Sequence, residues 1–257
     1  MTAPIARVIS SFAVVALTAA CGSSYYEIPL ETPLRPKLDV SGFERILVAG
    51  FIAGGSEDVD GNVETTRLLR SQLRNQSDLR VIDTDVLPLA SVATQGFAQA
   101  DLVTDDDGVT GPGPIVEDED LEPYEHLFAD VDYWKQIGEE YQQPLIVTGT
   151  VMFAPQERSG IVQRDQEIYD SLGRRSVVPV RTYMERKGFV LKPRFVFIDG
   201  RTGAVLYSEN FREEVLYNVN QTSPALSSYF ELMDRLLPSF LSTLSTQTIR
   251  GTRVLLQ

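Results

Sequence analysis

The feature that most constrains the fold is the segment 45–51, in which Arg45 is followed by the uninterrupted apolar run Ile-Leu-Val-Ala-Gly-Phe. A run of this length without alternating polar residues is typical of a β-strand that is buried on both faces. Such a strand must be covered, and we expect helices to pack on its sheet. With 257 residues, of which 43% are hydrophobic, the chain has enough apolar material for this core in one or two domains.

The segment after this run predicts a helix and a second strand. In residues 63–75, leucines at 68, 69 and 73 share one side, and Asp60 or Asn62 is placed to cap the amino end. Residues 79–83 then form a second apolar run. A strand, a helix and a strand at this spacing predict a right-handed βαβ unit with parallel strands. Further along the chain we expect two more helices and a strand, over 86–99, 124–142 and 145–153.

The second half of the chain changes to successive strands, which we expect at 161–169, 177–184, 189–198 and 204–217. The turn sequence of residues 199–203, Asp-Gly-Arg-Thr-Gly, favours a hairpin, and strands joined in this way form an antiparallel meander. A helix is expected to begin at Ser223-Pro224, and residues 253–256 to add a last strand. We therefore predict an α/β (α+β) fold: a mixed sheet with an amino-terminal βαβ unit, a carboxy-terminal antiparallel meander and helices packed on the sheet.

We expect a single α/β domain over residues 43–257 that carries two additions. Residues 101–122 are rich in Asp, Glu, Gly and Pro without apolar periodicity, which predicts a flexible acidic insertion. Residues 158–187 are dense in charge of both signs and predict a hairpin.

The amino end of the chain has the layout of an export signal. Residues 12–17 are apolar, Arg7 precedes them, and small residues lead to Cys21. The apolar run is shorter than the ~20 residues of a membrane-spanning helix. Cys21 is the only cysteine, so the chain forms no intrachain disulfide. We predict a signal peptide over residues 1–20 and an extended, flexible tether over 21–42, which contains three prolines.

The sequence Leu17-Thr18-Ala19-Ala20-Cys21 resembles the lipobox of bacterial lipoproteins, although that family prefers Leu at the position of Thr18. The resemblance implies cleavage before Cys21, diacylation of its sulfur and acylation of its new amino group, palmitate being the expected chain. Several acyl chains make a durable anchor where one does not. Because Gly22 is not the Asp that resembles an inner-membrane retention signal, we expect the protein in the outer membrane, facing the periplasm.

The composition and motifs point away from several function classes. The formal net charge of −13 disfavours nucleic acid and anionic lipid surfaces as partners. His126 is the only histidine, and no serine lies in a G-x-S-x-G elbow. No G-x-G-x-x-G or P-loop sequence occurs. We therefore expect neither a cofactor nor enzymatic activity, and an envelope hydrolase is kept only as an alternative.

One acidic stretch resembles part of a calcium loop. Side chains with oxygen ligands, which a hard cation prefers, stand at every second position: Asp58, Asp60, Asn62 and Glu64. An EF-hand loop, however, needs Gly where Val63 stands. We favour surface acidity over a metal site here and retain the four residues as calcium candidates.

The order of elements resembles one periplasmic α/β group: the amino-terminal domain of TolB and the curli-secretion lipoprotein CsgG, with the related penicillin-binding-protein activator lipoproteins. The matching segments are 46–51, 79–83, 144–151 and 195–211, and the resemblance covers about residues 43–245. It implies a docking or assembly module of the cell envelope that has a protein partner, its oligomeric state left open. The alternative is a CsgG-like secretion-channel subunit.

A membrane strand needs a clean apolar face over ~9–11 residues. In the 158–187 hairpin, the odd-numbered residues Gln163, Asp165 and Glu167 would lie on one face of a strand. The even-numbered Arg164 and Gln166 would lie on the other face. Neither face is apolar there, so we expect a soluble, protruding hairpin rather than a pore.

Overall fold

The computed structural model describes residues 25–95, 103–104, 110–111, 113–218, 221 and 223–256. The chain divides into two compact units: Lys37–Ser245 forms the larger one, and the smaller one contains the described residues 25–36 and 246–256.

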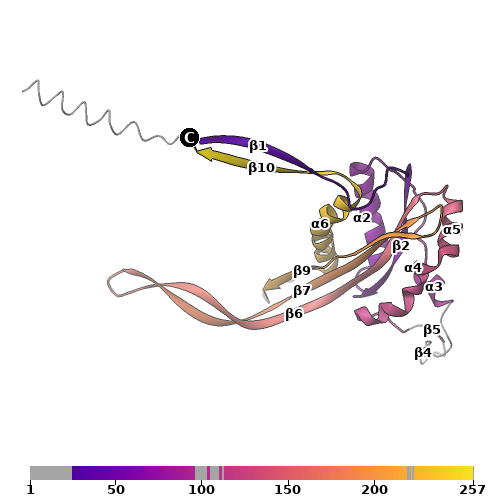
Figure 1. Cartoon of the computed structure of the whole chain (residues 1–257). Coiled ribbons are helices and arrows are strands. Elements are labelled where there is room, and N and C mark those ends of the chain that lie inside the picture. Colours follow the sequence, from indigo (N-terminus) through magenta and orange to yellow (C-terminus); the bar gives the residue numbers. More distant parts are fainter. Residues whose placement is uncertain are drawn as a thin grey trace, which may run out of the picture. The chain divides into compact units, whose positions relative to one another are not determined.

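The larger unit is built on a mixed sheet in the order β3-β2-β6-β7-β8, with β9 as a second partner of β7 (Figure 1). β2 is parallel to β3 and β6, whereas β7 runs antiparallel to β6, β8 and β9. The predicted fold class, with its βαβ unit and antiparallel meander, is confirmed. The strands are β2 (Arg45–Gly55), β3 (Arg80–Val81), β6 (Leu145–Tyr169), β7 (Arg175–Asp199), β8 (Val205–Asn210) and β9 (Glu213–Asn218).

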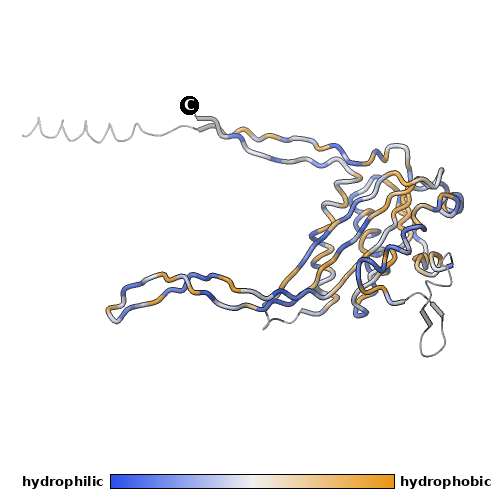
Figure 2. The backbone as a smooth tube through the Cα atoms, turned by 60° about the horizontal axis from the view of Figure 1, so that its bottom comes forward, coloured by the Kyte–Doolittle hydropathy of each residue, from blue (hydrophilic) through white to orange (hydrophobic). Residues whose placement is uncertain are grey.

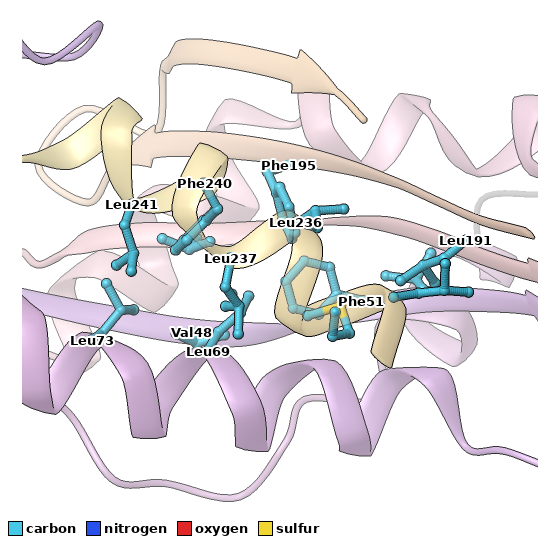
Figure 3. Close-up of a cluster of buried hydrophobic side chains, with 14 of the residues drawn as sticks. Val48, Phe51, Leu69, Leu73, Leu191, Phe195, Leu236, Leu237, Phe240 and Leu241 are labelled. Carbon is cyan, nitrogen blue, oxygen red and sulfur yellow. The ribbon is translucent and has the colours of Figure 1, made fainter. Parts of the chain in front are cut away.

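Helices cover both faces of this sheet, so β2 is buried on both sides, as its apolar run predicts. One face packs against α2 (Gly61–Gln76) and α6 (Ala225–Leu244). Figure 3 shows Leu69 and Leu73 of α2 and Phe240 of α6 gathered on this face. The opposite face packs against α3 (Leu89–Thr94), η2 (Asp118–Tyr124), α4 (His126–Ala129) and α5 (Val131–Glu140).

A β-bulge interrupts β2, because the register against β6 shifts between Val48 and Gly50. Gly50 has φ +142°, and a Cβ there would approach the Leu87 carbonyl oxygen to 2.9 Å, so this position favours glycine. Two side chains of α2 satisfy the backbone near the bulge. Arg70 donates from Nη2 to the Val48 carbonyl (2.8 Å), and Asn62 Oδ1 accepts from the Phe51 N–H (2.7 Å).

The helices agree with the predicted positions, with shifted ends. α2 is capped by Asp60, whose side chain accepts from the Val63 N–H at 3.0 Å. α3 is shorter than the predicted 86–99, although residues 96–99 lie outside the described part. The predicted helix 124–142 is broken at Asp130, which takes an extended backbone conformation and caps α5 by accepting from the Tyr133 N–H.

The acidic insertion differs from the prediction of a flexible segment over 101–122. Residues 113–122 are described, and η2 begins with a reciprocal capping box between Glu117 and Asp120. Leu121 and Tyr124 are buried against the sheet, and this burial holds the segment in place. Residues 101–102, 105–109 and 112 lie outside the described residues, and the short strands β4 (Val103–Thr104) and β5 (Thr110–Gly111) pair with each other.

Two long strands replace four of the shorter ones expected from the sequence. β6 joins the predicted strands 145–153 and 161–169, and β7 joins 177–184 and 189–198. The intervening polar residues do not end a strand because each strand pairs with the other along its whole length. The predicted strand 204–217 is divided into β8 and β9 at residues 211–212.

The smaller unit is a two-stranded antiparallel ribbon of β1 (Tyr25–Leu34) and β10 (Gln247–Leu256). Part of the predicted tether, residues 25–34, is therefore a paired strand, because β10 satisfies its backbone hydrogen bonds. For the same reason, residues 247–256 belong to this unit and not to the domain predicted over 43–257. The strand predicted at 253–256 lies within β10.

The bulge contacts of Arg70 predict a measurable loss of stability. Arg70→Met removes the hydrogen bonds to the carbonyls of Val48 and Thr84, and leaves both acceptors partly buried. We expect the free energy of unfolding, measured in urea, to fall by about 1–3 kcal/mol. Arg67→Met is the control on the same helix, because Arg67 is exposed and makes only a 3.8 Å ion pair with Glu64. Equal losses in both variants would contradict this role of Arg70.

Candidate docking surface

The most exposed feature of the larger unit is the distal half of the β6–β7 pair. β2 pairs with β6 only as far as Phe153, and β9 pairs with β7 only from Arg186 onward. Beyond these points the two strands continue as a two-stranded ribbon, which we call the arm (residues 159–185). At ~3.4 Å per residue, its eleven pairs extend about 37 Å from the sheet. Figure 1 shows the two strands leaving the sheet together. The predicted hairpin over 158–187 is thus a protruding element.

The outer edges of the arm carry backbone groups that no strand satisfies. Within the described residues, β6 has no outer partner along 154–169, and β7 has none along 175–185. Long open edges of this kind are templates for pairing with another strand. Only two prolines, Pro155 and Pro179, interrupt the row of N–H donors on these edges.

A single carboxylate organises the turn at the end of the arm. Asp170 Oδ1 accepts from the backbone N–H groups of Leu172 (2.9 Å) and Arg174 (2.8 Å), and Oδ2 accepts from Arg174 Nε at 2.7 Å. Hydrogen bonds from Arg174 hold the pKa of Asp170 below its usual value, so the carboxylate form that accepts these bonds is present at neutral pH. Gly173 supplies the positive φ (+74°) that the turn needs.

Both faces of the arm mix apolar and charged residues. Figure 2 shows apolar and polar residues following one another along both strands of the arm. On one face, Ile161 lies directly opposite Tyr183, and they are 72% and 60% exposed. The next pair along this face is Gln163 with Arg181. On the other face, Val178, Val180 and Val162 share the surface with Arg164 and Gln166. Exposed cross-strand apolar pairs of this kind are suited to contact with a partner.

The hairpin over residues 158–187 is basic although the chain is acidic. It contains seven basic and four acidic residues, a net charge of +3 in a chain of −13, whereas four arginines balance four acidic residues within the arm itself. Four of the seven cations are in ion pairs: Arg158 with Glu214, Arg174 with Asp170, Arg175 with Glu167 and Lys187 with Glu157. Within the described residues, Arg164 and Arg181 of the arm and Arg186 at its root have no ion-pair partner, so they present positive charge to a partner.

A hollow of about 590 Å³ lies where the arm leaves the sheet. Met152, Ala154 and Val190 provide its apolar floor, and Glu117 and Asp118 lie on its rim. Lys192 forms an ion pair with Asp118 across this rim. The hollow therefore joins the root of the arm to the acidic segment.

The acidic segment is tied to the body of the unit. Besides the pair of Asp118 with Lys192, Glu125 forms an ion pair with Arg194 of β7. The Asp120 side chain accepts from the Glu117 and Val116 N–H groups, both at 2.8 Å, and these bonds lower its pKa. Most of its charge thus stabilises local structure, although most of residues 113–125 are exposed.

The four calcium candidates do not converge in the structure. Asp60 caps α2, Asn62 accepts from the Phe51 N–H, and Glu64 faces Arg67. Asp58 Oδ2 accepts from the Ser56 hydroxyl at 3.4 Å. Across the described residues, no three His, Cys, Asp or Glu side chains gather as a metal site would require.

The only histidine and the only cysteine complete the predicted site residues. His126 is exposed at the start of α4, and its Nδ1 lies 2.7 Å from the Pro123 carbonyl oxygen. Cys21 lies outside the described residues. None of the helices in the described ranges is long and apolar enough to cross a membrane.

Comparisons with known proteins give no family for this chain. No family model matches it, and no curated protein does. Among solved structures it is similar to the lipoprotein GNA1162 of Neisseria meningitidis, with 13% identity, a TM-score of 0.34, and coverage of 76% of this chain and 96% of that one. It is also similar to a neuraminyllactose-binding hemagglutinin homologue of Helicobacter pylori, with 8% identity, a TM-score of 0.35, and coverage of 82% and 87%. TM-scores this low carry no argument, so the resemblance to TolB and CsgG stays a prediction.

The turn of the arm predicts a protease phenotype. Asp170→Ala removes three hydrogen bonds that close the turn, so the arm should open more often. We therefore expect trypsin to cleave after Arg164 and Arg181 about fivefold faster. This increase corresponds to a loss of ~1 kcal/mol of local stability. Asp170→Asn, which keeps the Oδ1 acceptor, should fall between this variant and the wild type. Mass spectrometry of timed digests measures both rates. Unchanged cleavage in the alanine variant would show that the turn does not control arm opening.

Proposed function

We propose that this protein is a lipid-anchored lipoprotein of the outer membrane, facing the periplasm, which uses its arm to dock onto a protein assembly of the cell envelope. The observation that carries the docking proposal is the open-edged arm, which belongs to the basic hairpin over residues 158–187. A two-stranded ribbon without a third strand or a packed face is marginally stable in water. A partner that adds a strand to either edge, or covers the Ile161–Tyr183 pair, would stabilise it.

The anchor and the arm have separate roles in this proposal. The lipobox-like sequence supports acylation of Cys21, which confines the chain to a membrane surface. Confinement raises the effective concentration of the arm near other envelope proteins, so a weak docking contact suffices. The basic hairpin over residues 158–187 would steer the chain toward an acidic partner, because charge complementarity increases the association rate.

We propose that the protein has no enzymatic activity. This part of the proposal is supported by the sequence and by the surroundings of the groups that usually act in catalysis. His126 lies beside a backbone carbonyl, and no serine elbow accompanies it. Of the alternatives, a secretion-channel subunit is favoured by one observation: both edges of the arm are open, so arms of several copies can pair edge to edge. The charges on both faces of the arm weigh against a lipid-facing role.

The anchor predicts a defined chemical product. Mass spectrometry of the protein from native-host membranes should find a triacylated peptide that begins at Cys21. Cys21→Ala should abolish both the modified peptide and membrane association. Unmodified protein that still carries residues 1–20, or soluble protein in the wild type, would contradict the anchor.

The docking role predicts a position-specific crosslink. A photo-crosslinking amino acid in place of Tyr183 should capture another envelope protein in the native host, whereas the same group in place of Leu206, exposed on β8, should not. The double change Arg164→Glu and Arg181→Glu should reduce capture at least tenfold, and Arg80→Glu, an exposed control outside the arm, should leave it unchanged. Crosslinks solely between copies of this chain would favour the channel subunit, and absence of any adduct at position 183 would contradict docking through the arm.

A further inference from the structure

One face of the ribbon of β1 and β10, which we call its apolar face, carries three large apolar side chains of β1. In a paired strand, alternate residues lie on opposite faces, so Ile28, Leu30, Thr32 and Leu34 share this face. Their partners across the ribbon are Arg253, Gly251, Ile249 and Gln247. These three apolar side chains are 40%, 47% and 46% exposed, so they form a stripe that the ribbon itself does not cover.

The opposite face of the ribbon is polar. Glu27 and Glu31 lie on it, and Glu31 forms an ion pair with its cross-strand neighbour Arg250 at 3.0 Å. Pro29 and Pro33 occupy the remaining positions of β1 on this face between 27 and 33. The ribbon is thus amphipathic, with a period of two residues in place of the 3.6 residues of an amphipathic helix.

The charge of this unit differs from that of the whole chain. Among residues 25–36 and 246–256 there are three arginines and two glutamates, a net charge of +1, whereas the whole chain carries −13. An anionic lipid surface that repels the rest of the chain therefore does not repel the ribbon.

The sequence places this ribbon next to the proposed anchor. Tyr25, the first residue of β1, follows Cys21 by four residues, which span at most about 14 Å when fully extended. An acylated Cys21 would hold its end of the ribbon within that distance of the headgroups. Leu256 of β10 lies opposite Tyr25 in the register, so the end of β10 would be held at the same distance from the headgroups.

We propose that the apolar face of the ribbon, with Ile28, Leu30 and Leu34, is a lipid-contacting surface that lies in the headgroup region of the bilayer. This inference rests on the lipid anchor of the proposed function. The ribbon is then a membrane-bound base for the chain and not a free spacer. The polar face, with the Glu31–Arg250 pair, is turned to water.

Site-specific fluorescence tests this directly in the full-length, acylated chain. The sulfur of Cys21 is blocked by its thioether, so a single new cysteine can carry an NBD probe, in Leu30→Cys on the apolar face or Glu31→Cys on the polar face. The protein is bound to vesicles of phosphatidylethanolamine and phosphatidylglycerol, with and without doxyl-labelled lipid, and flotation confirms membrane binding. We expect doxyl lipid to quench the probe at position 30 at least twofold more than at position 31, and aqueous iodide to quench them in the reverse order.

The outcomes separate the inference from the anchor. A chain that floats but shows equal doxyl quenching at both positions overturns lipid contact while the anchor stands. A probe at position 30 that is shielded from both doxyl lipid and iodide also overturns it, because protein, either a second copy or the larger unit, then covers the stripe. A wild-type chain that does not float overturns the anchor, and the lipid-contacting surface with it.

Discussion

The architecture of the larger unit depends on the pairing of β6 with β7. Each strand is 25 residues long, and their register is unbroken from Leu145 opposite Asp199 to Tyr169 opposite Arg175. One half of this pair is the centre of the sheet, buried by helices on both faces. The other half leaves the sheet as the arm. Because the hydrogen-bonded ladder is continuous, the buried half fixes the direction and register of the exposed half, which has no core of its own.

The sequence predicted the buried parts of the molecule better than the exposed ones. Residues 46–52 are apolar throughout, and the strand they form is buried on both faces. Asp60 caps α2 as its position before the apolar periodicity predicts. These features are local, since each is decided by residues within one element. The bulge at Gly50 was not predicted, because its contacts come from Arg70 and Asn62, which are distant in the sequence.

The errors have a common physical origin, which is contact between segments that are distant in the sequence. Residues 25–34 have the prolines of an extended tether, yet they form a strand because residues 247–256 pair with them. The acidic segment was predicted as flexible from its composition, but Leu121 and Tyr124 bury against the sheet and order η2. For the candidate site, the sequence located the charged hairpin at 158–187. It did not reveal that β6 and β7 run through the domain into the arm, since polar residues at 156–160 gave the appearance of a break.

We propose two surfaces for two partners: the ribbon for lipid and the arm for protein. The arm is then the docking element, and the body only presents it. The most direct measurement uses a shortened chain in which an Asn-Gly turn replaces residues 160–184. The turn joins Ser159 to Glu185, which already lie opposite each other. The proteins that this chain captures from native-host membranes are compared with those that the wild type captures. If urea unfolding of the body is unchanged, the account predicts that the shortened chain still reaches the membrane and captures no partner. Capture equal to that of the wild type by the shortened chain would contradict it.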